Sequence, residues 1–134
     1  MLITESIATH ERNEIIDITP IVRRALRNAA IQEGLCVVYI PHTTAGVSIN
    51  ENADPDVKHD VTEKLAALIP HREAYYQHGE GNSDSHLKTM LVGPSVSLIV
   101  TGGTLLLGQW QGIYFCEFDG PRRRTVQIKL MADR

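Results

Sequence analysis

The stretch SVSLIVTGGTLLLGQWQGIYFCEFDGPRRRTVQIKL, residues 95–130, decides the fold class of this chain. It consists of apolar runs rich in β-branched and aromatic residues, a composition that is typical of β-strands. Short turn sequences, TGG at 101–103 and DGP at 119–121, separate these runs. Strands that follow one another through tight turns predict a mainly antiparallel sheet, and not the alternating strand and helix order of a nucleotide-binding fold.

Helical segments precede this stretch. A capping residue followed by proline occurs at 19–20 and again at 54–55, which predicts a helix start at each place. Apolar residues at helical spacing continue the first helix towards Gly34 and the second towards Pro70. A third, short helix is expected over 83–93. We therefore predict an α+β fold in which a mainly antiparallel, sandwich-like β-sheet packs against two or three helices.

Composition limits the classes of function. The chain suits a single domain over residues 1–134, and 43% hydrophobic with 22% charged residues is typical of a soluble globular protein. A formal net charge of −3 gives no electrostatic reason to expect a nucleic-acid partner. No apolar window of about 18 residues occurs, so no membrane insertion is expected and a cytoplasmic location is predicted. Cys36 and Cys116 lie in apolar runs without CxxC spacing, which predicts reduced, buried thiols.

Histidines gather in one polar segment, YYQHGEGNSDSHLK at residues 75–88. His78 and His86 flank a glycine-bearing loop that can bring both imidazoles to one point, and His42 follows the apolar strand LCVVYI. A catalytic metal commonly needs about three protein ligands and one open position, so these three histidines are candidate ligands of a divalent cation. The alternative that each is a solvated or hydrogen-bonded histidine stays open, because their spacing is no defined metal motif.

A second polar cluster, NENADPDVKHD, covers residues 50–60. Asp54 and Asp56 suit the N-terminus of the helix that follows, where a capping side chain and negative charge are both favourable. Glu51 precedes the cap, so the helix does not need it, and we expect the strand before it to carry it towards His42. Glu51 is therefore a candidate general base, or a residue that orients a ligand, although an acidic helix start explains much of the cluster.

Trp110 and Gln111 interrupt an apolar run between two glycines at 108 and 112. Glycines in a strand allow a ligand or another chain to approach closely, and an indole can stack on a flat ring. Trp110 is equally compatible with the core. The run Arg122–Arg124 is compatible with a phosphate site and also with a solvated edge strand.

Four sequence blocks resemble the YjbQ-like family of small proteins, whose members are described as secondary thiamine-phosphate synthases. In order, the blocks are HTTAGVSINENADPDV (42–57), YYQHGEGNSDSHLK (75–88), GPSVSLIV (93–100) and LLLGQWQGIYFCEFDGPR (105–122). The resemblance covers most of the chain, from about residue 36 to the end. One departure is Gln109, because the family usually has threonine before the tryptophan.

The resemblance implies a YjbQ-like α+β fold that assembles as a homotrimer with sites near the subunit boundaries. The apolar strands at 95–100 and 111–118 also favour association, since they offer edge-capable surface. A metal-binding cluster of His42, His78 and His86 is implied as well. The remaining implied site residues are Glu51, Glu80 and Asp84 as catalytic groups, and Asn52, Lys88, Trp110 and Gln111 as substrate-binding groups.

The implied reaction joins hydroxymethylpyrimidine diphosphate to thiazole phosphate and releases pyrophosphate, so the expected partner is a small phosphorylated heterocycle. A divalent metal ion and basic residues would stabilise the departing diphosphate. Diphosphate chemistry favours magnesium, whereas a histidine cluster suits zinc or another transition metal, and both stay open. Two other classes also stay open: a metal-dependent hydrolase in which Glu51 or Glu80 takes the proton, and a non-catalytic trimeric metal- or ligand-binding protein.

Overall fold

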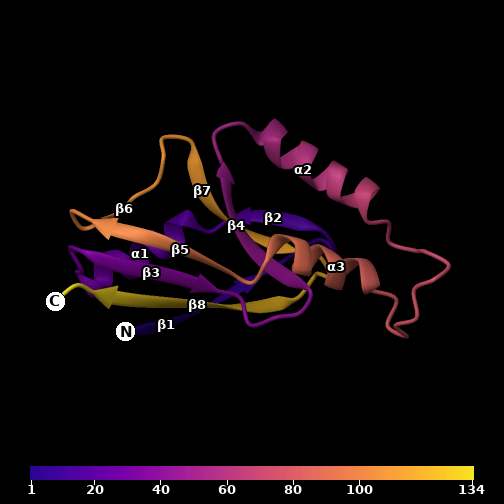
Figure 1. Cartoon of the computed structure of the whole chain (residues 1–134), viewed down its shortest axis with the longest axis horizontal. Helices are drawn as coiled ribbons and strands as arrows, with labels where there is room; N and C mark the ends of the chain where they lie inside the picture. The colour runs from indigo at the N-terminus through magenta and orange to yellow at the C-terminus, as the bar shows by residue number, and fades with distance from the viewer.

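The computed structural model describes residues 1–134, which form two sheets and three helices (Figure 1). In chain order the elements are β1 (Leu2–Ala8), β2 (Glu14–Asp17), α1 (Thr19–Ala29), β3 (Gly34–Tyr39), β4 (Ala45–Glu51), α2 (Pro55–Leu68), α3 (Ser83–Val92), β5 (Ser95–Thr101), β6 (Thr104–Leu105), β7 (Gln111–Glu117) and β8 (Arg123–Ala132). The strand orders are β1-β8-β3-β5-β6 and β2-β7-β4. Every strand pair is antiparallel, which confirms the predicted α+β class.

Alternating burial along the strands places the core between the sheets. In β8, Val126, Ile128 and Leu130 are buried, and the residues between them point outwards or are only half-buried. β7 is buried on both faces: one face joins a main core of 18 residues shared with the five-stranded sheet and α1, and the other joins a smaller cluster next to α2 and α3. Because burial of a large apolar side chain contributes about 1.5–3 kcal/mol, this alternation determines which face of each strand points inwards.

The expectation that strand 111–118 offers a free edge is wrong. β7 is the central strand of its sheet and pairs with β2 on one side and β4 on the other. β5 also has a neighbour on each side, β3 and the short β6. What β5 leaves exposed is part of a face, where Ile99 has 53% of its surface accessible.

Two helix boundaries show how local chemistry and packing compete. Asp54 caps α2 as predicted, since its carboxylate accepts a hydrogen bond from the N–H of Asp56 at 2.9 Å. α1 ends well before Gly34, because Ala30 adopts a left-handed backbone with φ of 56°. Gly34 instead begins β3, where an added β-carbon would lie 2.0 Å from the carbonyl oxygen of Met131. The close approach of β3 to β8 therefore requires glycine at this position.

Both cysteines are free and buried, as predicted. Burial raises the pKa of the Cys36 thiol to about 11 and that of the Cys116 thiol to about 12, so both remain protonated at neutral pH. None of the three helices combines the length and the apolar character that crossing a membrane requires.

Candidate functional site

α3 carries several of the predicted site residues and turns a polar face towards the protein. Asp84, Ser85, Lys88 and Thr89 are its buried residues. The hydroxyl of Ser85 donates a hydrogen bond to the carbonyl oxygen of Phe118 at 2.6 Å, which ties the helix to the end of β7. A buried charge is costly unless it is paired, so the charges of Asp84 and Lys88 need partners inside the molecule.

Arg12, from the loop between β1 and β2, supplies the main partner. Its Nη1 and Nη2 donate to the two carboxylate oxygens of Asp84, each at 2.9 Å. The Nζ of Lys88 lies 3.6 Å from the same carboxylate and donates to Oδ1 of Asn13 at 3.2 Å. The side chain of Asp84 has no exposed surface. In this conformation Asp84 is an ion-pair partner and not a group that a substrate reaches, and Lys88 is equally occupied.

Burial and the neighbouring charges shift the pKa values of Asp84 and Lys88 in opposite directions. Burial alone would raise the pKa of Asp84, but the hydrogen bonds and charge of Arg12 hold it below its ordinary value. Burial lowers the pKa of Lys88, while the charge of Asp84 acts in the other direction. The hydrogen bond from Arg12 to Asp84 raises the pKa of Arg12, which therefore stays charged. The carboxylate of Asp84 thus pairs with two cations, Arg12 and Lys88.

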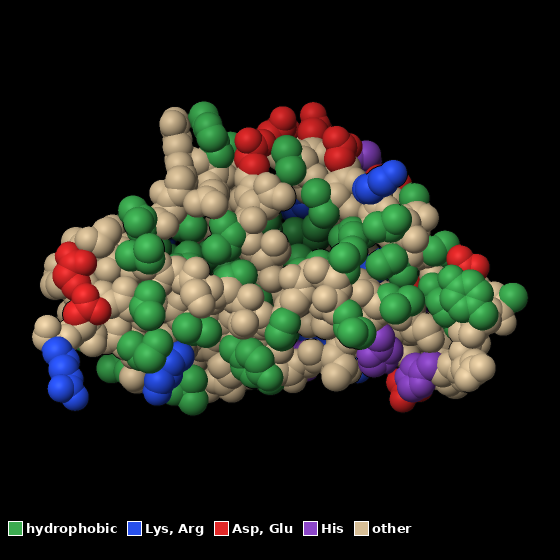
Figure 2. Space-filling view, viewed as in Figure 1, with side chains coloured by type: hydrophobic (Ala, Val, Ile, Leu, Met, Phe, Trp, Pro, Cys, Tyr) green, Lys and Arg blue, Asp and Glu red, His purple; other side chains and the backbone are tan.

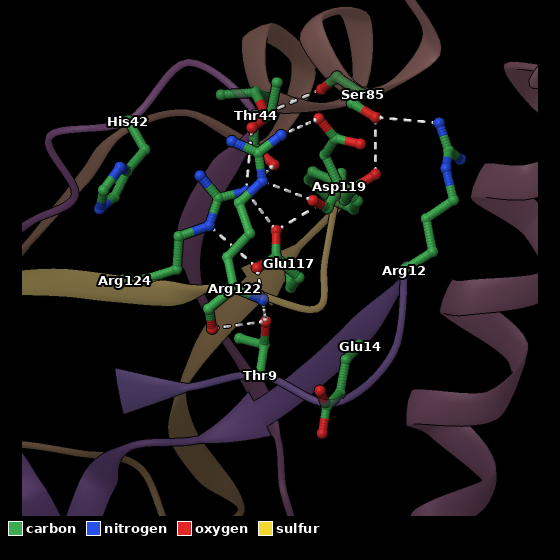
Figure 3. Close-up of polar contacts among 12 residues, drawn as sticks. Thr9, Arg12, Glu14, His42, Thr44, Ser85, Glu117, Asp119, Arg122 and Arg124 are labelled. Carbon is green, nitrogen blue, oxygen red and sulfur yellow. Dashed lines mark hydrogen bonds and ion pairs between the residues drawn. The ribbon is translucent and has the colours of Figure 1, made fainter. Parts of the chain in front are cut away.

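Glu117 and Arg124 form a second buried ion pair (Figure 3). Glu117 accepts hydrogen bonds from Nε of Arg124 at 2.9 Å and from the hydroxyl of Thr9 at 2.8 Å. Nη2 of Arg124 also donates to Oγ1 of Thr44 at 2.9 Å. Burial alone would raise the pKa of Glu117, but hydrogen bonds from Arg124 and Thr9 hold it below its ordinary value. The pair ties β7 and β8 to the loop that carries His42.

The three consecutive arginines form neither a phosphate site nor a solvated edge as a group. Nη2 of Arg122 donates to Oδ2 of Asp119 at 2.8 Å, and Nη1 of Arg123 donates to Oγ of Ser6 at 3.1 Å. Arg124 is buried with Glu117. All three side chains are therefore engaged by groups of the same chain.

His78 and His86 lie together. Their ring centroids are 5.2 Å apart and the ring planes meet at 80°. Oε2 of Glu80 lies 4.0 Å from Nε2 of His78. Figure 2 shows histidine side chains at the surface beside α3. The structure thus brings together two of the three predicted metal ligands, with a carboxylate at their edge.

His42 does not join this pair. Its Nε2 accepts a hydrogen bond from the N–H of Thr125 at 2.9 Å, and Figure 3 shows its ring beside Arg124. A neutral imidazole that accepts at Nε2 carries its proton on Nδ1, so neither nitrogen retains a lone pair for a metal. Burial lowers the pKa of His42, which favours this neutral form. Within one chain, no group of three or more His, Cys, Asp or Glu side chains is arranged to hold a metal ion.

Two depressions of the surface meet at His78. The wider one, of about 580 Å³, has aromatic and aliphatic side chains in its lining, which consists of Tyr75, Tyr76, Gln77, His78, Ser83, His86 and Leu87. The narrower one, of about 160 Å³, is polar and is lined by His71, Arg72, Glu73, Tyr76, His78, Gly81 and Ser83. An aromatic surface and a basic group therefore flank the same imidazole. We refer to the two together as the histidine depression.

Glu51 lies at the other end of the three-stranded sheet. In the β4–β7 register Glu51 pairs with Gln111, whereas Ala45 pairs with Glu117 at the end where the buried ion pairs lie. The length of β4 from Ala45 to Glu51 corresponds to about 20 Å, at about 3.4 Å per residue. Contrary to our expectation, β4 therefore carries Glu51 away from His42.

Asn52, Trp110 and Gln111 lie at this same far end. Nδ2 of Asn52 donates to Oδ2 of Asp17 at 3.1 Å, and Oε1 of Gln111 accepts from the N–H of Gly108 at 2.7 Å. Trp110 is 56% exposed, so its alternative interpretation as a core residue is wrong. The predicted site residues thus form two groups within one chain, one around α3 and one at the opposite end of β4 and β7.

Arg12, Glu117 and Thr9 were not among the residues that sequence patterns indicated. Glu117 had a usable signal, because a lone carboxylate inside the apolar run IYFCEF must find a buried partner. Arg12 had none, since it stands in the polar segment ERN and its partner is 72 residues away.

Comparison with known proteins gives consistent results. Residues 4–133 match the sequence model of the family described as UPF0047 protein YjbQ-like. The chain is 50% identical to the UPF0047 protein MJ1081 of Methanocaldococcus jannaschii over 134 residues, which is 100% of this chain and 96% of that protein. It is 51% identical to the UPF0047 protein YugU of Bacillus subtilis over 131 residues, covering 98% and 99% of the two chains.

Solved structures show the same architecture. The crystal structure of an uncharacterised YjbQ/UPF0047 protein of Clostridium acetobutylicum superimposes with a TM-score of 0.94 at 47% identity, over 96% of this chain and 99% of that one. A hypothetical protein of Aeropyrum pernix gives a TM-score of 0.93 at 36% identity, over 99% of each chain. The chain therefore belongs to the YjbQ/UPF0047 family.

Proposed function

We propose that this protein is a thiamine-phosphate synthase-like transferase whose substrates bind at the histidine depression. The observation that carries the proposal is the junction at His78 of an aromatic surface with a polar one that contains Arg72. A pyrimidine ring needs a flat apolar contact, and its diphosphate needs cationic groups. In this arrangement Tyr75 and Leu87 contact the ring, and Arg72 contacts the diphosphate.

The proposed reaction is a substitution at carbon. The ring nitrogen of thiazole phosphate attacks the methylene carbon of hydroxymethylpyrimidine diphosphate, so that a C–N bond forms and the C–O bond to the diphosphate breaks. Pyrophosphate leaves with the bonding electrons. Arg72 stabilises the negative charge that develops on the leaving group, which is where a fixed cation has its largest effect on rate.

A divalent cation is part of the proposal. His78 and His86 are the residues that would hold it, and its chemistry would be charge neutralisation of the diphosphate. The donor set fits in part, since two adjacent imidazoles suit zinc or a similar transition metal better than magnesium. His42 is left out of the ligand set because its Nε2 accepts the Thr125 N–H.

Assembly as a homotrimer is proposed as well. It is supported by large apolar side chains that the single chain leaves exposed, including Met90 at 84% and Ile99 at 53%. Light scattering at micromolar concentration should give about three times the mass of one chain.

The experiment is metal analysis of the purified protein followed by incubation with the two phosphorylated substrates, with thiamine phosphate measured by mass spectrometry. We expect product, and a loss of rate of about a hundredfold in His78→Ala and in His86→Ala. Glu51→Gln, at the far end of β4, serves as the matched control and should retain the rate. Failure to form product, or an unchanged rate in both histidine variants, overturns the proposal. Hydrolysis of the diphosphate without C–N bond formation would instead identify a hydrolase, with Glu80 as the base to test.

A further inference from the structure

α2 is attached to the rest of the protein only by apolar contacts. None of its residues is fully buried, although it lies alongside β2 (Figure 1). Its hydrogen bonds and its one ion pair stay within the helix and its two capping residues, Asp54 and Ile69. A segment with so few buried contacts opens more easily than the core does.

An apolar cavity of about 80 Å³ lies between α2 and the three-stranded sheet. Val57, Val61 and Leu65 recur every fourth position, so they share one face of α2, and all three line the cavity while only half-buried. On the sheet side the lining includes Tyr114 and Cys116, which are buried. Protein interiors leave few voids larger than a water molecule, so this space between a helix and the sheet that it covers is a candidate binding site.

A wider polar cleft of about 330 Å³ adjoins the cavity on the β2 side of α2. Ile15 and Lys58 line both spaces. The charged residues that line the cleft are the carboxylates of Glu11, Glu14 and Glu63 and the basic side chains of Lys58 and His59. Carboxylates outnumber basic groups, and Figure 2 shows further acidic side chains gathered over the start of α2. The charge around the cleft therefore favours a positively charged ligand.

We infer that a small primary amine with a short, branched aliphatic tail binds under α2, with its tail in the cavity and its ammonium group in the cleft. Size supports the choice of tail: a dry cavity of about 150 Å³ holds benzene, so a space about half as large suits an aliphatic group of about four carbons. Charge supports the choice of head group, because an ammonium can donate hydrogen bonds to the carboxylates of Glu11, Glu14 or Glu63. No residue of the histidine depression lines either space, so the inference does not depend on the proposed function.

Three probes with nearly the same tail test the inference: isopentylamine, isopentanol and isovalerate, which are cationic, neutral and anionic at neutral pH. Each is titrated into the isotopically labelled full chain, and the amide NMR signals of Val57, Val61 and Cys116 are followed. We expect saturable shifts with isopentylamine, weaker binding of isopentanol, and no binding of isovalerate.

Filling the cavity should remove binding. Val61→Phe places a ring in the space that the tail needs, and the variant should fold because Val61 is only half-buried in the parent. Val57→Leu is a smaller change in the same lining and should weaken binding in the same direction. Leu68→Phe is the matched control on α2, since Leu68 is 61% exposed and lines neither space, and it should bind isopentylamine like the parent.

Removing charge should affect only the amine. The double variant Glu11→Gln with Glu63→Gln should weaken isopentylamine binding by about fivefold, as loss of exposed ion pairs does, and leave isopentanol binding unchanged. Absence of saturable shifts with isopentylamine would overturn the inference. Equal affinity for isopentylamine and either of the other probes, or unchanged binding in both cavity-filling variants, would overturn it as well. Absence of transferase activity would leave these titrations unaffected.

Discussion

Arg12 and Asp84, which are 72 residues apart in the sequence, form a two-pronged ion pair with both N–O distances at 2.9 Å. The pair joins the loop before β2 to the first turn of α3, and Lys88 shares its carboxylate. Asp84 lies at the start of the helix that carries His86. This contact therefore holds one histidine of the candidate site in place, although Asp84 itself does not reach the surface.

Replacement of Asp84 by alanine should destabilise the protein strongly. The change leaves Arg12 and Lys88 without their shared carboxylate, and removal of one partner from a buried ion pair costs about 3–5 kcal/mol. Urea unfolding should show the loss as a lower transition midpoint. Glu80→Ala is the control, since Glu80 is exposed and should change the free energy of unfolding by less than about 0.5 kcal/mol. Equal stability of the two variants would contradict the assigned role.

Acid should destabilise the protein through the same buried carboxylates. The pKa values of Asp84 and Glu117 are lower in the folded protein than in the unfolded chain, so the folded state binds fewer protons. Their stabilisation is fully present above the unfolded values, about 3.9 and 4.3, and is lost as the pH falls through the lower folded values. The free energy of unfolding, measured between about pH 6 and pH 2, should therefore decrease as the pH falls. The decrease should be smaller in Glu117→Gln.

His42 should add a second pH dependence at higher pH. Burial lowers the pKa of His42 in the folded protein below its ordinary value of about 6.5. As the pH falls, the unfolded chain therefore binds the proton at a higher pH than the folded protein does. Stability should therefore fall as the pH drops from about 6.5 towards the folded pKa. NMR titration of the imidazole measures that pKa directly. A pKa at or above the ordinary histidine value of about 6.5 would refute the role of His42 as a buried acceptor. In His42→Gln this part of the pH dependence should be absent.

The three predicted metal ligands should differ in their effect on metal affinity when each is replaced by alanine. Zinc titration of the chain should lose affinity in His78→Ala and in His86→Ala, because these two rings are adjacent. His42→Ala should retain the affinity, since Nε2 of His42 already accepts the Thr125 N–H. An equal loss in all three variants would show that His42 turns towards the pair or that a second copy supplies it.

Gly46 should resist substitution. An added β-carbon would lie 2.6 Å from the carbonyl oxygen of Gly93, a backbone atom at the end of α3 that cannot move aside alone. Gly46→Ala should therefore cost about 1–3 kcal/mol, as overpacking does elsewhere in protein cores. Gly79→Ala is the matched control, because a β-carbon there meets nothing within 4 Å. Thermal unfolding of the two variants should differ clearly.

Only parts of the candidate site could be predicted from the sequence. The histidine segment was recognisable because His78 and His86 stand eight positions apart around glycines in one loop, so that a local fold brings them together. His42 and Glu51 were assigned to the same site from their position near one strand. Their separation depends on the direction and length of β4, which no nearby residue reveals.

By itself the sequence determined the class of the fold, the strand character of the apolar runs within 95–130 and the capped start of α2. It did not determine the strand partners, since β7 pairs with β2 and β4 and β8 pairs with β1 and β3. The features that it did determine depend on residues close together in the chain: the alternation of one strand, the turn after it, and a carboxylate two positions from the N–H that it accepts. Only the tertiary structure decided that Arg12 pairs with Asp84, that His42 accepts the N–H of a residue 83 positions later, and that α3 exposes its apolar face. Such contacts form because whole sheets and helices pack, and burial then requires each charge and each N–H to find whichever partner the packing has brought near.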